Sequence, residues 1–520
     1  MNQYVFDPVK PVVETRFGKL RGITYGNINF FMGIRYAKAR RFQMPEDPEP
    51  WKGVKNAYTY GPVCPLMFTA TPPSYYRGLH MLQVYSEDCQ NLNIWAPKDI
   101  SGEKKPVFVW IHGGGYFAGN ALEEYSFDGF HMASNGNVVF VSINHRLNIL
   151  GHLNLADYGE EFRHSVNVGI ADLVAAMKWI HENISAFGGD PENVTICGHS
   201  GGGGKVQCLY QIEEAAPYFR QGIVLSGCMR NELSDTQECS RKAAAAILGD
   251  LGITKENIEK VYEVSYRDLV DAYGHVAQRL QEEGNSPKWS PVADEYFRGF
   301  PLDAGFMPWS KDKPLLIGST LGEFPLCRLT AEEKEAMGEA ERVAYLRERY
   351  GEEAEKLMAL FRKAYPAHDI LDLAYTDTMV RIPSMNTAVL HSGNKLKNTY
   401  IFLAAYNAPE DNWVPLWHGG DVCYILQNED RVYVLNEAVY GQKLAKIFST
   451  LTLNFARTGN PNTEYLPEWK PVSAENRNTM VIDRECACLD GFDDDLTAAL
   501  DPLNPKFFLE FAKMFEKKDP

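Results

Sequence analysis

A serine flanked by glycines stands at position 200, in the segment Gly198-His199-Ser200-Gly201-Gly202. A serine in a Gly-x-Ser-x-Gly pattern can act as a nucleophile, because small neighbours let the chain turn sharply between a strand and a helix and expose the hydroxyl. The apolar run 194–197 ends directly before the pattern and predicts that strand. We therefore interpret Ser200 as a nucleophile.

The longer glycine run at 198–206, GHSGGGGKV, admits other interpretations. A phosphate-binding loop would need glycine at 199 and serine or threonine at 206, but His199 and Val206 stand there. A dinucleotide-binding Gly-x-Gly-x-x-Gly pattern that starts at Gly198 would need glycine at 200. The remaining alternative is a glycine-rich loop that packs a helix closely on a sheet.

A second glycine run, His112-Gly-Gly-Gly-Tyr116, follows the apolar run 107–111. Backbone N–H groups of such a loop can bind the oxyanion that forms when a nucleophile attacks a carbonyl group. Glycine lets the substrate approach the backbone closely. An ordinary tight turn is the alternative, and it becomes less plausible when a Gly-x-Ser-x-Gly pattern follows.

The acidic residue of such a site comes after the serine and before the histidine in the chain. Glu323 follows a strand-like run in PLLIGSTLGEF (314–324), so a strand can deliver it to the edge of the sheet. Asp294 is the rival, but no clear strand precedes it. We expect Glu323 to be the acid.

The histidine is expected in a loop after the next strand. The run 400–403 predicts that strand, and His418 follows it in AYNAPEDNWVPLWHGGD. His391 comes before the strand, and His368 lies in a helical segment. We therefore expect His418 to be the base.

Alternating strands and helices must position these residues. The segment 169–184 carries apolar residues at helical spacing, and 444–455 does the same, with Gly459 as the expected cap. Short apolar runs predict strands at 107–111, 138–141, 194–197, 222–226, 313–318 and 400–403. Strands that alternate with helices predict an α/β fold with a mostly parallel central sheet.

The remaining segments complete this architecture. Residues 11–36 alternate between apolar and polar and predict antiparallel strands at the N-terminal edge of the sheet. The charged segments 230–290 and 325–380 are helical in pattern, and we interpret them as insertions that cap the active site. We therefore expect residues 1–520 to form a single domain.

The composition limits the classes of function. With 45% hydrophobic and 23% charged residues, the 520-residue chain has an ordinary globular composition. Its net charge of -16 argues against nucleic acid as a partner, because phosphate backbones need basic surfaces. Neither the ten cysteines nor the twelve histidines stand at zinc-binding spacing, so we expect no metal.

The chain shows no signal for a membrane or for export. No run reaches the roughly 18 apolar residues that span a bilayer, so we expect no transmembrane segment. The opening MNQYVFDPVKPVVET lacks the apolar stretch of a secretory signal peptide. We expect a cytoplasmic protein, although a mature secreted form would read the same.

Several longer motifs accompany the glycine runs, and together they resemble those of type-B carboxylesterases, the relatives of bacterial para-nitrobenzyl esterases and cholinesterases. The resemblance covers roughly residues 10–515. Its most specific block is WIHENISAFGGDPENVTICGHSGG at 179–202. Other matching segments are FMGIRYA (31–37), SEDCQNLNIWAP (86–97), SINHRLNILG (142–151) and NFARTGNPN (454–462).

The resemblance implies an α/β-hydrolase fold and a role for each matching residue. Ser200 would be the nucleophile, with Glu323 as the acid and His418 as the base. Ser226 would support this triad without being one of its three members. The backbone N–H groups of the oxyanion hole would come from Gly114, Gly115 and Gly201.

The chain departs from the family pattern beside the nucleophile. The family usually has glutamate before the serine and alanine after it, whereas His199 and Gly201 stand here. Because position 201 contributes only a backbone N–H group, we expect alanine to be tolerated there.

The reaction that the resemblance implies is hydrolysis of a small-molecule carboxylic ester through an acyl-enzyme, with no cofactor. Two alternatives stay open. A hydrolase of lactones, amides or carbamates would use the same steps, and some family members are non-catalytic binding modules. The binding modules lack a residue of the triad, whereas this chain keeps all three.

Overall fold

The structure is a computed structural model, and it describes residues 3–7, 9–67, 81, 83–100, 102–228, 234–324, 329, 331–394, 396–408 and 414–506. The chain divides into two compact units. Unit 1 comprises Met1–Thr71, His80–Ile223 and Asn231–Lys313, and unit 2 comprises Pro72–Leu79, Val224–Arg230 and Pro314–Pro520. That the whole chain acts as one domain stays a prediction. The first residues of both predicted insertions, 230–233 and 325–328, lie outside the described part.

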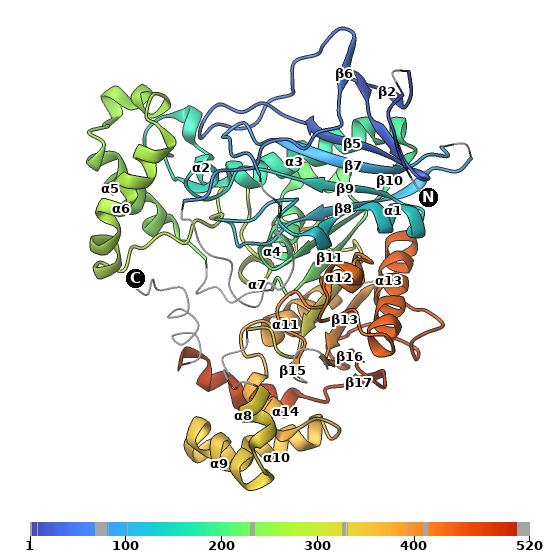
Figure 1. The fold of residues 1–520 in the computed structure, drawn as a ribbon. Helices are drawn as coiled ribbons and strands as arrows, with labels where there is room; N and C mark the ends of the chain where they lie inside the picture. The colour runs from blue at the N-terminus through green and yellow to red at the C-terminus, as the bar shows by residue number, and fades with distance from the viewer. Residues whose placement is uncertain are drawn as a thin grey trace. The chain divides into compact units, whose positions relative to one another are not determined.

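Unit 1 contains a sheet whose strands follow the order β1-β4-β5-β7-β9-β8-β10 (Figure 1). Strand β8 pairs in parallel with both β9 and β10. The strands from β1 to β7 pair antiparallel, which confirms the predicted N-terminal edge. The bounds are β1 Tyr4–Val5, β4 Ile23–Tyr25, β5 Ile28–Arg35, β7 Asn91–Pro97, β9 Val139–Ile143, β8 Lys105–Ile111 and β10 Gly189–His199.

Part of the predicted edge leaves this sheet. Strands β2 (Val12–Thr15), β3 (Gly18–Arg21) and β6 (Val54–Asn56) form a separate three-stranded sheet. The chain passes from one sheet to the other at Gly22, where an added Cβ would lie 2.2 Å from the carbonyl oxygen of Phe30. The alternating pattern of 11–36 does not distinguish one sheet from two.

Helices flank the sheet of unit 1. Helix α3 (Val168–Asn183) confirms the predicted segment, and its apolar residues are buried. It contacts α4 (Gly201–Tyr210), which follows β10 directly. The shorter helices are α1 (Phe130–Gly136) and α2 (Asn148–His152).

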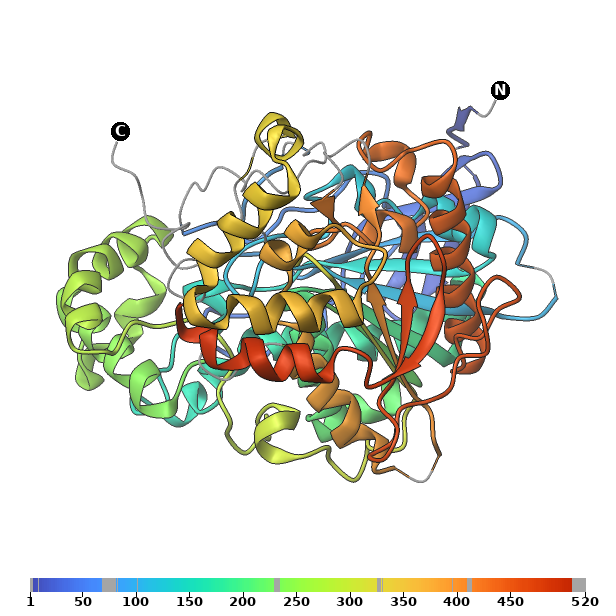
Figure 2. The same cartoon turned by 90° about the horizontal axis from the view of Figure 1, so that it is seen from below.

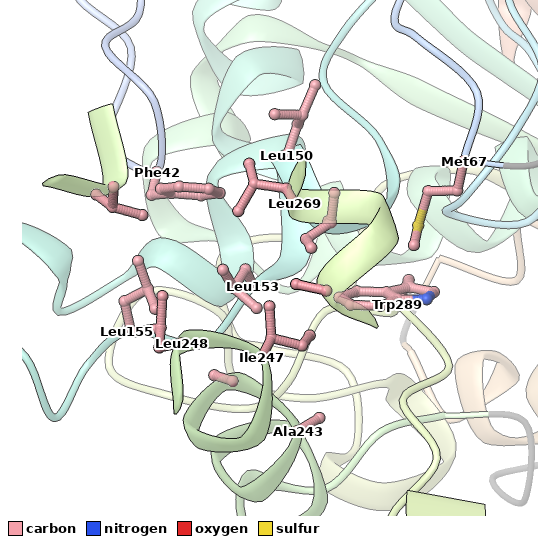
Figure 3. Close-up of a cluster of buried hydrophobic side chains, with 14 of the residues drawn as sticks. Phe42, Met67, Leu150, Leu153, Leu155, Ala243, Ile247, Leu248, Leu269 and Trp289 are labelled. Carbon is pink, nitrogen blue, oxygen red and sulfur yellow. The ribbon is translucent and has the colours of Figure 1, made fainter. Parts of the chain in front are cut away.

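The first insertion is a helix pair within unit 1. Helix α5 (Gln237–Asp250) and helix α6 (Tyr266–Glu282) begin at Thr236 and Ser265, whose side chains accept backbone N–H bonds. Figure 3 shows the buried cluster beneath this pair. Its members include Phe42, Met67, Leu150, Leu153, Leu155, Ala243, Ile247, Leu248, Leu269 and Trp289. The shared cluster joins the insertion to the other segments of unit 1.

Unit 2 contains the parallel strands β12 (Leu315–Thr320), β13 (Thr399–Ala404) and β16 (Asn478–Ile482), with β17 (Ala487–Asp490) antiparallel at the edge. Strand β11 (Gln221–Leu225) runs from unit 1 into unit 2. The described α-helices are α8 Ala331–Ala336, α9 Glu339–Tyr350, α10 Ala354–Ala364, α11 Arg381–Ser392, α12 Val422–Ile425, α13 Tyr440–Thr458 and α14 Asp494–Leu500.

The C-terminal part of unit 2 differs from the sequence expectation. Helix α13 ends at Gly459 with a left-handed φ of 78°, as expected. Strands β16 and β17 come between α13 and α14, and the sequence patterns did not predict them. Figure 2 shows α14 beside α10, and the two helices are in contact. None of the described helices combines the length and apolar character needed to cross a bilayer.

A buried ionic cluster joins the second insertion to the sheet of unit 2. Nδ1 of His368 donates to Asp372 at 3.1 Å, and Nε2 donates to Asp483 at 2.9 Å. His368 lies just after α10, whereas Asp483 follows β16. Burial alone lowers the pKa of His368, but the hydrogen bonds to the two carboxylates outweigh it and raise the pKa to about 9.

Replacing His368 by glutamine should therefore destabilise the protein in a pH-dependent way. The folded pKa lies above the ordinary 6.5, so the stabilisation is complete below pH 6.5 and is lost as the pH rises through about 9. Removing one partner of a buried ionic cluster costs about 3 kcal/mol. We expect a loss of that size in urea unfolding at pH 6 and a smaller loss at pH 9.5. An equal loss at both values would contradict the charged state of His368.

Candidate active site

Ser200 occupies a sharp turn between β10 and α4. Its backbone has φ 56° and ψ −127°, a conformation that costs a residue with a side chain about 1–3 kcal/mol. The glycines on either side have no room for a Cβ. An added Cβ at Gly198 would lie 2.3 Å from the carbonyl of Gly202, and one at Gly202 would lie 2.1 Å from the Ile111 oxygen. The backbone thus has the strand–turn–helix form expected for a nucleophile.

The loop after β8 lies against this turn. A Cβ at Gly113 would be 3.3 Å from Cβ of Ser200. Gly114 and Gly115 have left-handed φ values of 82° and 62°. A side chain at Gly114 would also meet the Ala118 carbonyl oxygen at 2.4 Å. Only glycine suits these positions, and the loop brings its backbone next to Ser200.

The surroundings of Gly201 contradict the expectation that alanine would be tolerated at this position. A Cβ at this position would lie 2.1 Å from the carbonyl oxygen of Gly115 and 2.4 Å from its Cα. The expectation that alanine would be tolerated is therefore wrong, because the glycine loop packs on the first residue of α4. The glycine loop can lie this close to α4 because Gly201 has no side chain.

Glu323 and His418, both in unit 2, are brought together as predicted. Nδ1 of His418 donates to Oε2 of Glu323 at 2.6 Å. The backbone supports this bond, since the N–H group of His418 donates to the Glu323 carbonyl at 2.7 Å. A β-bridge between Gly322 and Trp417 holds the two segments in register.

Two further groups bind the carboxylate of Glu323. Ser226, which follows β11, donates its hydroxyl to Oε1 at 2.6 Å, in the supporting position expected from the sequence. The backbone N–H of Thr320 donates to the same oxygen at 2.7 Å. The second donor has no sequence signal, because every residue except proline carries a backbone N–H group.

Burial governs the titration of this pair. Glu323 is 0% exposed and His418 is 2% exposed. Burial raises the pKa of Glu323 to about 7, although the bonds from Ser226 and Thr320 act in the opposite direction. Burial lowers the pKa of His418 to about 3. The imidazole is therefore neutral around pH 7, as a general base must be.

Two more buried acids lie in the surroundings of Glu323 and were not singled out from the sequence. Burial and then the charge of Glu323 raise the pKa values of Asp377 and Asp421 to about 7. Asp421 stands three residues after His418, in the segment HGGD, which is the signal that could have identified it.

The rival residues have other partners. Asp294 accepts a hydrogen bond from Nδ1 of His164 at 2.8 Å and binds the N–H groups of its own turn. His391 bonds the hydroxyl of Thr399 at 2.7 Å. His368 lies in the ionic cluster. Within the residues that the structure describes, no group of three or more His, Cys, Asp or Glu side chains could hold a metal ion.

Comparisons with known proteins place this geometry in a family. A sequence model described as the carboxylesterase family matches residues 9–495. Para-nitrobenzyl esterase of Bacillus subtilis (strain 168) is 31% identical over 494 residues, which cover 91% of this chain and 95% of that protein. Carboxylesterase 4A of Bos taurus is 29% identical over 516 residues, 90% of each chain.

A solved structure of an esterase from anaerobic Clostridium hathewayi matches with a TM-score of 0.91 at 38% identity. The match covers 96% of this chain and 99% of that one. The solved neighbours are esterases of the α/β-hydrolase fold, and the family model spans nearly the whole chain. The chain therefore belongs to the carboxylesterase family and is a carboxylic ester hydrolase.

Proposed function

We propose that the chain hydrolyses carboxylic esters through an acyl-enzyme formed on Ser200, with His418 as general base and Glu323 as its acidic partner. The 2.6 Å bond between His418 Nδ1 and Glu323 Oε2 carries this proposal. It fixes the imidazole tautomer, so that Nε2 is the nitrogen that takes the proton from Ser200. The strained turn at Ser200 is the expected setting for the nucleophile.

The proposed reaction has two acyl transfers. Ser200 attacks the ester carbonyl while His418 takes its proton, and the imidazolium then protonates the departing alcohol. Water attacks the acyl-enzyme in the same way and releases the acid. Glu323 stabilises the imidazolium in both steps. The N–H groups of Gly114, Gly115 and Gly201 bind the oxyanion, and each such donor is worth roughly 10²–10³ in rate.

The relatives favour an ester as the substrate. Para-nitrobenzyl esterase and the esterase described as hydrolysing aliphatic aromatic polyesters are both named for ester cleavage. Lactones, amides and carbamates would pass through the same steps, but the names of these two relatives refer to esters. We propose small-molecule carboxylic esters as the substrate class.

Ser200→Ala tests the proposal directly. Removing the nucleophile of a catalytic triad costs on the order of 10⁶ in kcat. We expect the variant to fold and to lose hydrolysis of a para-nitrophenyl ester to that extent. An organophosphonate should label Ser200 in the native protein, as mapped by peptide mass spectrometry. Near-normal turnover by the variant, or labelling at another residue, would refute the proposal.

Glu323→Gln and Asp294→Asn form a matched pair. An amide beside His418 favours the wrong tautomer, and the corresponding change in a serine protease lowers kcat about 10⁴-fold. We expect Glu323→Gln to approach that loss in steady-state kinetics. Asp294→Asn should keep kcat within about threefold, because its partner is His164. The reverse result would show that Asp294 is the acid.

The pH dependence of kcat/KM should reflect the Glu323–His418 pair. Because burial raises the pKa of Glu323 to about 7, the pair takes up a proton as the pH falls through neutrality. Protonation removes the negative charge that stabilises the imidazolium. We therefore expect kcat/KM to rise between pH 5.5 and 8.5 and to level off above. A flat profile, with stability confirmed at each pH, would contradict this assignment.

A further inference from the structure

Lys205 is a buried charged residue that the proposed mechanism does not use. It lies in α4, five positions after Ser200, and is 0% exposed. A lysine on a helix near the surface of a sheet normally extends into water, because removing an ammonium group from water is costly. A fully enclosed lysine beside an active site therefore needs a specific partner.

The partner is the backbone at the start of the glycine loop. Nζ of Lys205 donates to the carbonyl oxygen of His112 at 3.1 Å. The carbonyl of His112 and the N–H group of Gly113 belong to one planar peptide group, so a bond that fixes one fixes the direction of the other. Lys205 thus sets the peptide plane from which the loop starts.

An acidic residue and two imidazole rings influence the ammonium group electrostatically. Attraction from Glu123 acts on Lys205, and the carboxylate of Glu123 is close to the far end of the loop. A Cβ at Gly119 would lie 3.2 Å from Oε2 of Glu123. The ring of His112 stacks on His145 with centroids 5.1 Å apart.

The two rings stay uncharged. Burial, followed by the charge of Lys205, keeps the pKa values of His112 and His145 well below 6.5. Burial lowers the pKa of Lys205 itself to about 7, while attraction from Glu123 acts in the opposite direction. The cluster therefore contains one basic group, Lys205, at the start of the loop and one acidic group, Glu123, near its far end.

The loop needs such an anchor. Three successive glycines have more backbone freedom than any other sequence, so the loop loses much entropy when it adopts one conformation. An oxyanion hole works only when its donors are held in place before the substrate arrives. A side chain from α4, the helix that begins next to Ser200, can supply this restraint.

We propose that Lys205 is a positioning residue of the oxyanion hole, which holds the His112 carbonyl and thereby orients the N–H groups of Gly114 and Gly115. The inference rests on the proposed function of these N–H groups. According to this inference, Lys205 contributes to the stabilisation of the transition state and hardly affects substrate binding.

The test compares Lys205→Met and Lys205→Gln with Val206→Ala. Methionine has no donor, and the amide of glutamine ends one atom short of the His112 carbonyl. Val206 is the buried neighbour on the same helix, and its truncation weakens the packing of α4 without removing the bond. Titration of Ser200 with a phosphonate counts the folded enzyme in each sample. The probe for the transition state is a trifluoromethyl ketone.

We expect both Lys205 variants to lose about 10- to 100-fold in kcat with KM within about threefold, since the change acts on the oxyanion. The inhibition constant of the trifluoromethyl ketone should rise by the same factor as kcat/KM falls. Val206→Ala should lower Tm and leave kcat per titrated site within about threefold.

Unchanged kcat in either folded Lys205 variant would overturn the inference. So would an equal loss in Val206→Ala, which would assign the effect to packing. If neither Lys205 variant folds, Lys205 is required for stability, and this result would also overturn the inference. If the native protein is not labelled at Ser200, the proposed function fails. If it is labelled and the Lys205 variants remain fully active, only the inference fails.

Discussion

The close approach of α4 to the end of β8 is the constraint on which the Ser200 half of the proposed site depends. Gly202 faces the Ile111 carbonyl and Gly201 faces the backbone of Gly115, each without room for a methyl group. This contact of backbone on backbone fixes the turn at Ser200 and the glycine loop relative to each other. Both segments are strained or left-handed, so neither would keep its conformation alone. The buried sheet strands on either side provide the rigid support.

A different constraint applies to the Glu323–His418 half of the proposed site, because the charge of the Glu323 carboxylate must be stabilised inside the protein. Glu323 is fully buried, and two donors, Ser226 and the N–H of Thr320, offset part of the cost of its charge. His418 adds a third bond to the same carboxylate. Burial thus raises the pKa of Glu323 and lowers that of His418, so the imidazole is neutral near pH 7.

Much of this follows from the sequence. Short, continuously apolar runs predicted β8, β9, β10, β12 and β13, because buried parallel strands are apolar on both faces. Chain order after each strand selected Glu323 and His418 from their rivals. Strands β16 and β17 were missed, because they are short and have polar residues at their ends. The bond from Lys205 and the close contact at Gly201 depend on distances between segments remote in the chain, which no local pattern encodes.

The division of the chain also has a consequence for its synthesis. All segments of unit 1 have been synthesised once residue 313 has been added, whereas most of unit 2 consists of residues from 314 onward. Domains generally form during synthesis from the N-terminal side. A nascent chain that ends near 313 therefore carries Ser200 and its glycine loop but lacks both Glu323 and His418. Under the proposed mechanism, the order of residues along the chain thus delays hydrolysis until His418 has been synthesised.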